Sequence, residues 1–122
     1  MKVLVVDDDR LNCMTMVQLL TDAGHHAGSF ETAEEALEVA SCDHVGAIIL
    51  DLRMPTLDGL AFLKQIRALK PELAVIMMSA FWTPKTKEDA RRLGAQAMLT
   101  KPFNMDEILA ILARMTAGGQ PT

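Results

Sequence analysis

The sequence contains no tyrosine, and its only aromatic residues are one tryptophan and four phenylalanines among 122 residues. A core built from this chain must therefore be mainly aliphatic, and the 50% of residues that are apolar can supply it. This length suits a single domain of common size. No apolar run approaches the roughly 20 residues of a membrane-spanning helix. The start, MKVLVVDDD, also lacks the pattern of a signal peptide.

Cysteine and positive charge are scarce as well. Cys13 and Cys42 are the only cysteines, and they have neither metal-ligand spacing nor a disulfide framework. We therefore expect inert thiols in a reducing cytoplasm. The formal net charge of −4 argues against a nucleic-acid binder, because such a protein needs a basic surface to neutralise phosphates.

Short apolar runs rich in branched residues predict the strands of a sheet. The predicted strands are KVLVV (2–6), VGAIIL (45–50), LAVIMM (73–78), AQAML (95–99) and, with a weaker pattern, HHAGSF (25–30). The stronger runs are continuous rather than alternating, which is typical of strands buried on both faces of a parallel sheet.

Segments with apolar residues at helical spacing lie between these runs. The predicted helices are 10–23, 33–41, 59–69, 84–94 and 105–116. In the first of them, the apolar face is predicted to carry Leu11, Met14, Val17 and Leu20. Residues that favour the N-cap position precede four of the helices: Asp9, Thr32, Thr83 and Asn104.

The resulting order, a strand and then a helix repeated five times, predicts an α/β fold with a parallel sheet covered by helices on both faces. In such sheets the ligand site lies outside the carboxyl ends of the strands. Polar residues follow four of the predicted strands at this edge: Asp7, Asp8 and Asp9; Asp51; Ser79; and Thr100 with Lys101. We expect these side chains to lie close together.

Carboxylates gathered in this way repel one another, and they require a cation when they are buried together. Mg²⁺ prefers one or two carboxylates, waters and a phosphate oxygen. A lysine and a hydroxyl beside the metal suit the remaining phosphate oxygens. The pattern therefore predicts a Mg²⁺-dependent phosphoryl site with an aspartate nucleophile.

Five segments, VVDDD, LDLRMP, LDG, MMSA and KPF, agree in order and spacing with the receiver domain of two-component response regulators, and the resemblance covers essentially the whole chain. It implies a flavodoxin-like, doubly wound (βα)₅ fold with strand order 2-1-3-4-5. It assigns 1–117 to the receiver domain and leaves 118–122 as a flexible tail or the start of a linker. It implies a phospho-acceptor that catalyses its own phosphorylation and slow dephosphorylation, rather than an enzyme.

The resemblance also implies roles for the acidic residues. Asp51 resembles the residue that accepts the phosphoryl group. Asp7 and Asp8 resemble the acidic pair that binds Mg²⁺ together with Asp51. Arg53, two residues after the acceptor, should offer its backbone carbonyl to the metal.

Two further residues match the family pattern at later strand ends. Ser79 resembles the hydroxyl residue that follows the phosphoryl group, and Lys101 resembles the lysine that binds it. The bond between Lys101 and Pro102 resembles one that is cis in the family, which would help to aim the lysine inward.

The chain departs from the family pattern at Met98, where many members carry tyrosine or phenylalanine. Methionine could fill the same space, but it has neither a hydroxyl nor a rigid ring. Phe81 and Arg53 occupy positions that tune the access of water to the acyl phosphate. We expect these two side chains to shield it and to prolong the phosphorylated state.

As partners, the resemblance implies a histidine kinase or a histidine phosphotransfer protein as the donor and a downstream effector as the reader. The effector would read the face formed by 84–94, 95–99 and 105–116, and the resemblance also allows a dimer through this face. No direct contact with nucleic acid or membrane is expected. An exposed Trp82, in the loop after Ser79, would mark a contact residue.

The residue pattern also allows two other functions. The haloacid-dehalogenase-type phosphatases use an Asp-x-Asp nucleophile motif, and Asp7 and Asp9 match it, followed by Ser79 and Lys101. In that interpretation Asp7 attacks the substrate, but no acidic metal-binding pair follows a further strand and the chain is short for a core and a cap. The third alternative is an interaction module that works without phosphate.

Overall fold

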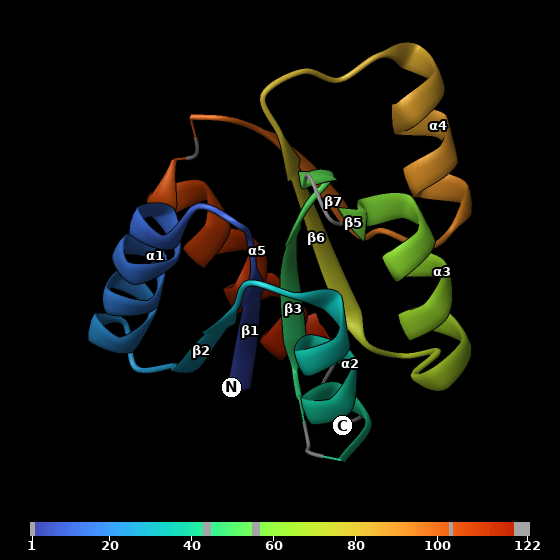
Figure 1. Cartoon of the computed structure of the whole chain (residues 1–122). Coiled ribbons are helices and arrows are strands. Elements are labelled where there is room, and N and C mark those ends of the chain that lie inside the picture. Colours follow the sequence, from blue (N-terminus) through green and yellow to red (C-terminus); the bar gives the residue numbers. More distant parts are fainter. Residues whose placement is uncertain (1, 43–44, 55–56, 103, 119–122) are drawn as a thin grey trace.

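The computed structural model describes residues 2–42, 45–54, 57–102 and 104–118, and a parallel sheet lies at its centre (Figure 1). Its strands, in chain order, are β1 (Lys2–Val6), β2 (His26–Phe30), β3 (Ala47–Asp51), β6 (Ala74–Ser79) and β7 (Ala97–Thr100). They are arranged side by side in the order β2-β1-β3-β6-β7. This is the predicted order 2-1-3-4-5, and the predicted flavodoxin-like α/β fold is confirmed.

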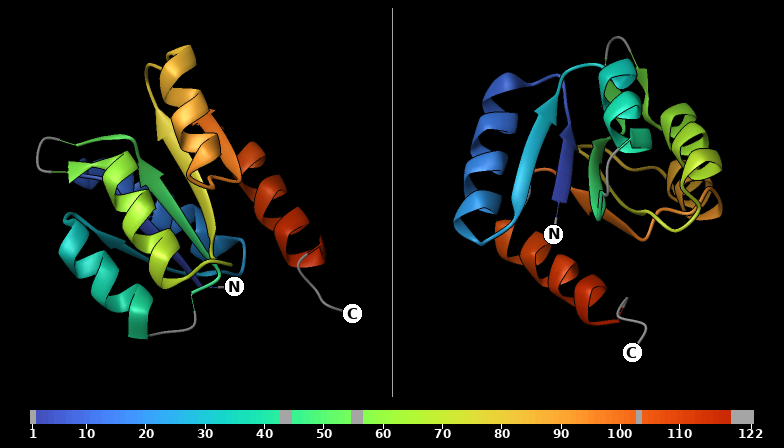
Figure 2. Two further views of the ribbon diagram at one scale, coloured as in Figure 1. Left: turned by 90° about the vertical axis from the view of Figure 1, so that its right-hand side faces the viewer. Right: turned by 90° about the horizontal axis from the view of Figure 1, so that it is seen from below.

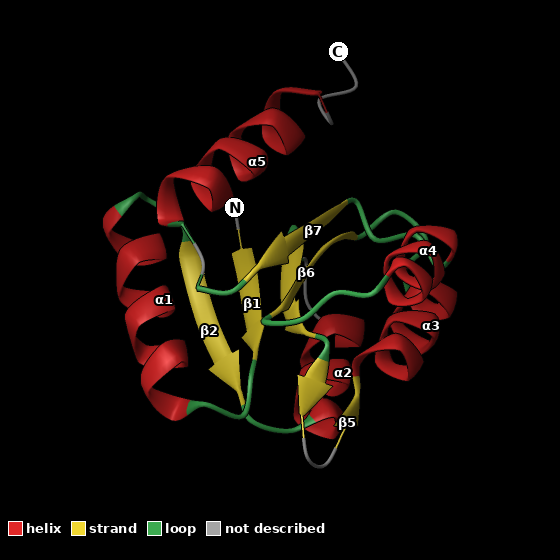
Figure 3. Cartoon of the chain, turned by 90° about the horizontal axis from the view of Figure 1, so that it is seen from above, coloured by secondary structure: helices red, strands yellow, loops and turns green. Residues whose placement is uncertain are grey.

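Five helices connect the strands and cover both faces of the sheet. They are α1 (Arg10–Asp22), α2 (Ala33–Cys42), α3 (Gly59–Leu69), α4 (Pro84–Arg92) and α5 (Met105–Gly118). Figures 2 and 3 show α1 and α5 on one face and α2, α3 and α4 on the other. Parallel neighbours need such crossover connections, and right-handed crossovers in both directions from β1 place helices on both sides.

The strands separate two apolar clusters because successive side chains point to opposite faces. Val3 and Val5 of β1 pack with α1 and α5 residues, whereas Leu4 and Val6 pack with residues of α2 and α3. All residues of β3 are buried, as expected of a central strand that is covered on both sides.

The prediction for the buried face of α1 is wrong near the start of the helix, at Leu11 and Met14. Leu11 is 72% exposed and Met14 is 61% exposed, while Cys13, Met16 and Leu20 are the buried residues of this helix. The sequence offers apolar residues on more than one side of the helix, so spacing alone did not distinguish the face that contacts the sheet from the face that meets solvent.

The segment after β3 contains a small hairpin that the sequence did not predict. Its strands are β4 (Arg53–Met54) and β5 (Leu57–Asp58), which pair antiparallel. Asp58 then caps α3 by accepting a hydrogen bond from the Leu60 backbone at 3.0 Å.

Gly59 is required where α3 passes the end of β3. A Cβ atom at this position would lie 2.7 Å from the Leu52 carbonyl oxygen and 2.9 Å from that of Asp51. The Gly59 backbone instead donates a hydrogen bond to the Leu52 carbonyl at 3.1 Å. The LDG motif therefore combines a helix cap with a close backbone approach.

Predicted caps at other helix starts are present. Asp9 accepts from the Asn12 backbone, Thr83 forms a capping box with Thr86, and Thr32 accepts from the Glu35 backbone at 3.4 Å. At the other end of the chain, α5 extends to Gly118, beyond the predicted helix end at 116. Of the predicted tail, 119–122 lie outside the described residues. In the described ranges, no helix combines the length and the apolar character needed to span a bilayer.

Candidate functional site

Three carboxylates meet at the carboxyl edge of the two central strands. Asp7 follows β1 and Asp51 is the last residue of β3, and these strands are neighbours with Val6 opposite Leu50. The strand order reverses between β1 and β3, so the connections leave in opposite directions and open the edge there. Oxygen atoms of Asp7, Asp8 and Asp51 all lie within 4.8 Å of one another.

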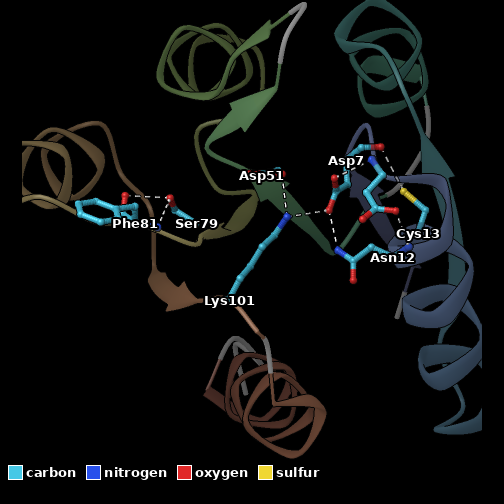
Figure 4. Close-up of polar contacts among 8 residues, drawn as sticks. Asp7, Asn12, Cys13, Asp51, Ser79, Phe81 and Lys101 are labelled. Atoms are coloured by element: carbon cyan, nitrogen blue, oxygen red, sulfur yellow. Dashed lines mark hydrogen bonds and ion pairs between the residues drawn. The ribbon is translucent and has the colours of Figure 1, made fainter.

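Lys101 reaches this cluster from the far side of the sheet edge, after β7. Its Nζ atom is 2.8 Å from Asp51 Oδ2 and 3.2 Å from Asp7 Oδ2 (Figure 4). The Lys101 backbone also donates to the Ser79 carbonyl at 2.8 Å, which fixes the start of the side chain. The peptide bond from Lys101 to Pro102 is cis, as the resemblance implied. The next residue of the KPF motif, Phe103, lies outside the described residues.

Asp7 is completely buried, and each of its carboxylate oxygens accepts hydrogen bonds. The Asp9 backbone donates to Oδ1 at 3.0 Å, and the Asn12 side-chain amide donates to Oδ2 at 2.7 Å. Burial by itself raises the pKa of Asp7, but these hydrogen bonds and the nearby Lys101 charge outweigh it, so the pKa is lowered overall. Asp7 is thus held as a carboxylate.

Lys101 shows the complementary effect. Burial alone lowers its pKa, but the hydrogen bond to Asp51 and the charges of Asp7 and Asp51 raise it overall. Lys101 and Asp7 are therefore both held in their charged forms at neutral pH. Asp8 is exposed and adds a third negative charge at the mouth of the site.

Sequence reasoning missed Asn12. This residue lies in the first turn of α1, half-buried, and its amide orients Asp7. Its position five residues after Asp7 places it near the strand end, but an asparagine in a first helical turn is common and gives no specific signal. The contact depends on how α1 is set against β1, which the sequence pattern does not specify.

Cys13 lies next to the site and is inert, as expected from the sequence. Its thiol donates to the Asp7 carbonyl with a separation of 3.2 Å. Burial and the charge of Asp7 raise the pKa of the thiol to about 11. The thiol therefore stays protonated at neutral pH and is a poor nucleophile. The side chain of Cys42 is outside the described part of the structure.

Ser79, at the end of β6, is buried at the same edge. Its Oγ atom accepts from the Phe81 backbone N–H at 3.1 Å and donates to the Phe81 carbonyl at 3.0 Å. Figure 4 shows the Ser79 side chain turned to Phe81, apart from the group formed by Asp51, Lys101 and Asp7. The structure thus brings Ser79 to the edge but not into contact with the carboxylates.

The remaining predicted residues surround this centre. Arg53 lies in β4, directly beyond the site, with its backbone opposite Asp58, while its side chain lies outside the described part. Phe81 is 69% exposed beside Ser79. Met98 is half-buried in β7, opposite Met77, and packs against the core on the α2–α4 face.

The donor set fits a hard divalent cation. Three carboxylates within reach of a common point give all-oxygen ligation, and a single ammonium group leaves negative charge uncompensated. Within the described residues, this is the group of acidic side chains whose oxygen atoms converge closely enough to bind a metal.

Comparison with known proteins agrees with this geometry. The family model of the response regulator receiver domain matches residues 3–113. The chain is 34% identical over 115 residues to the transcriptional regulatory protein ZraR of Escherichia coli K12, a match that covers 94% of this chain and 26% of that protein. The chain therefore spans about a quarter of the length of such curated relatives.

Solved structures give the same result. The chemotaxis protein CheY4 of Vibrio cholerae is 31% identical with a TM-score of 0.87, and the match covers 93% of this chain and 97% of that one. A response regulator of Burkholderia pseudomallei, solved with a phosphorylated aspartic acid and a calcium ion, is 25% identical with a TM-score of 0.86, over 97% of this chain and 70% of that one. The chain belongs to the response regulator receiver domain family and is a phospho-accepting signalling domain of a two-component system.

Proposed function

We propose that Asp51 accepts the phosphoryl group and that the side chains around it assist the transfer. The observation that carries this assignment is the 2.8 Å contact of Lys101 Nζ with Asp51 at the reversal point of the sheet, beside Asp7 and Asp8. Asp51 is the carboxylate in this cluster that ends the central buried strand, so its position is fixed by the sheet.

In the transfer, an Asp51 carboxylate oxygen attacks the phosphorus atom of a phosphohistidine on the donor. A P–O bond forms while the P–N bond breaks, and the electron pair returns to the imidazole, which takes up a proton from solvent. Lys101 and Ser79 bind the oxygens of the new aspartyl phosphate, and Lys101 needs little movement because it already contacts Asp51.

Asp7, Asp8, Asp51 and the Arg53 backbone carbonyl would hold Mg²⁺. When bound, Mg²⁺ supplies positive charge that stabilises the phosphoryl oxygens during transfer. The chain's own contribution is to keep Asp7 ionised and oriented, through the Asp9 backbone and the Asn12 amide. Fixed ligands lose less freedom when a metal binds.

The donor is a histidine kinase or a histidine phosphotransfer protein, and a downstream effector reads the product on the face formed by α4, β7 and α5. Ser79 and Lys101 join the site to the two ends of this face, because α4 follows Ser79 and α5 follows Lys101. We assign 1–117 to the receiver domain, and we place the chain in the cytoplasm, which the free, buried Cys13 supports.

Intact mass after incubation with Mg²⁺ and acetyl phosphate tests this proposal. The wild-type chain should gain one phosphoryl group only when Mg²⁺ is present, and Asp51→Asn should gain none. Asp22→Asn, the same change at an exposed position at the end of α1, is the matched control and should behave as wild type.

Two other results would contradict the proposal. Phosphate release from monoesters that is lost in Asp7→Asn but kept in Asp51→Asn would favour a phosphatase with Asp7 as nucleophile. A wild-type chain that is inactive in both assays would favour an interaction module that works without phosphate.

A further inference from the structure

Trp82, the only tryptophan of the chain, has a defined partner in the loop between β6 and α4. It is half-buried, so the sequence-based condition for a contact residue, an exposed ring, is not met. Its indole Nε1 donates to the Leu99 carbonyl with a separation of 2.8 Å, and its ring packs against the core on the α2–α4 face. The indole therefore connects this loop to β7.

This hydrogen bond is one of two that join the loop after β6 to the end of β7. Leu99 lies in β7, next to β6 and opposite Met78. Two residues later, the Lys101 backbone donates to the Ser79 carbonyl at 2.8 Å. The segments 79–82 and 99–101 are thus joined at both ends, by the backbone at Ser79 and by the indole at Trp82.

The Ser79 hydroxyl forms its hydrogen bonds within the joined segment 79–82. Both of its hydrogen bonds go to the backbone of Phe81, the residue that precedes Trp82. If Ser79 turns toward a phosphoryl group on Asp51, Phe81 loses both contacts and the tight turn opens. Trp82 is covalently attached to that turn, so its indole cannot keep the Leu99 contact without opposing the movement.

We propose that Trp82 is a positioning residue that holds Ser79 away from Asp51 in the unphosphorylated protein. Its bond to Leu99 forms when Ser79 is bound to Phe81 and is released when Ser79 binds the phosphoryl group. This inference rests on the proposed role of Asp51 and Ser79. Many family members carry an aromatic residue at the position of Met98, whose side chain has neither a ring nor a hydrogen-bond donor. In this proposal, Trp82 is the aromatic residue that responds to the movement of Ser79.

The first test follows the solvent exchange of the indole N–H by ¹H–¹⁵N NMR, in which a single tryptophan gives a single signal. Spectra are compared for the free chain, with Mg²⁺ alone, and with Mg²⁺ and beryllofluoride, a phosphoryl mimic. Because a net hydrogen bond changes populations by about threefold to tenfold, we expect exchange to accelerate about that much with beryllofluoride and not with Mg²⁺ alone. An unchanged exchange rate overturns the proposal.

The coupling through Ser79 is tested in Ser79→Ala, which lacks the hydroxyl that moves. The indole of this variant should show the same exchange rate with and without beryllofluoride. A response as large as that of the wild type would mean that Trp82 does not act through Ser79, and the proposal would be wrong.

The second test uses Trp82→Phe, which keeps an aromatic ring but removes the donor and reduces the size of the ring system. Intact mass should show an initial rate of phosphorylation by acetyl phosphate about threefold to tenfold faster than wild type, with the same Mg²⁺ concentration at half-maximal rate. In the Ser79→Ala background the same change should add no acceleration. A rate equal to or slower than that of the wild type overturns the proposal. If Trp82→Phe does not fold, the NMR measurement on the wild-type chain still tests it.

The results separate this inference from the proposed function. A wild-type chain that is phosphorylated on Asp51 while the indole and Trp82→Phe show no effect rejects the role of Trp82 alone. A wild-type chain that gains no phosphoryl group rejects both.

Discussion

At the scale of single residues, Lys101 compensates charges that the fold brings together. Its side chain is 23% exposed, whereas those of Asp7 and Asp51 are 0% and 8% exposed. The two carboxylates have lost most of their water, and the ammonium group of Lys101 contacts both of them. We therefore expect Lys101 to affect stability as well as its proposed binding of the phosphoryl group.

Replacing Lys101 by methionine should lower the free energy of unfolding by about 1–3 kcal/mol without metal, because two buried carboxylates lose their contact with the ammonium group. Urea denaturation in the presence of EDTA measures this loss, and millimolar Mg²⁺ should restore part of it. Lys85→Met removes an exposed lysine that pairs with the half-buried Asp89 at 3.5 Å, and it should cost less than about 0.5 kcal/mol. Equal costs for the two variants would contradict the charge balance assigned to Lys101.

The residues around Ser79 and Asp51 lead to a prediction about the lifetime of the phosphorylated state. By resemblance to the family, Phe81 and Arg53 are expected to limit the approach of water to an aspartyl phosphate. We predict that the phosphorylated chain survives well beyond seconds after the donor is removed. Intact mass measured over time checks this, and Phe81→Ala should shorten the lifetime. Complete decay of the wild type within seconds would be incompatible with shielding.

At the scale of elements, the start of α3 packs directly against the backbone of Asp51 and Leu52 at the end of β3. Gly59 lets the helix start against the Asp51 and Leu52 carbonyls, and the preceding Asp58 caps it. A side chain at position 59 must displace backbone rather than a flexible neighbour. The glycine is therefore tied directly to the geometry of Asp51, the proposed acceptor.

Gly59→Ala should destabilise the chain by about 1–3 kcal/mol and slow phosphorylation of Asp51, because its Cβ would overlap backbone atoms. Thermal denaturation and the acetyl phosphate assay measure the two effects. Gly28→Ala in β2 is the control, since its Cβ would meet only the Phe30 ring at 4.0 Å. We expect that control to stay within about 0.5 kcal/mol of wild type.

Helix α1 offers a matched pair of methionines for testing which of its faces is buried. Met16 is completely buried against the sheet, and Met14, two residues earlier, is 61% exposed. Met16→Ala should cost about 2–4 kcal/mol of unfolding free energy, and Met14→Ala less than about 1 kcal/mol. Chemical denaturation of both variants gives the comparison. Similar losses of unfolding free energy in the two variants would mean that Met14 is also buried in solution.

At the scale of the whole molecule, stability should depend on pH at both ends of the range. The pKa of Asp7 is lowered from 3.8, so its stabilising contribution is present above about pH 4 and is lost as the pH falls through the folded-state value. The pKa of Lys101 is raised from 10.5, so its contribution is complete below that pH and is lost as the pH rises through the folded-state value. Between these limits, the pair should contribute a constant amount.

Urea denaturation across pH in EDTA checks these signs. Asp7→Asn should flatten the acid limb and Lys101→Met the alkaline limb, each relative to wild type. A wild-type chain that becomes more stable below pH 4 would contradict the hydrogen bonding assigned to Asp7.

The sequence alone determined the alternation of the five sheet strands with the five helices, the parallel sheet and the identity of the edge that carries the chemistry. Strand runs such as 2–6 and helices such as 59–69 could be predicted because hydrophobic periodicity and N-caps are local properties. Asp7, Asp51, Ser79 and Lys101 could be placed at one edge because each stands at the carboxyl end of a strand, and all strands of the sheet are parallel.

Only the tertiary structure decided the contacts at that edge. It brought Asn12 to Asp7, turned Ser79 to Phe81 and joined Trp82 to Leu99. It also placed the exposed side of α1 at Leu11 and Met14. Each of these features depends on the angle at which a helix or loop packs on the sheet. Packing angles result from side chains far apart in the sequence, so no local pattern of the chain specifies them.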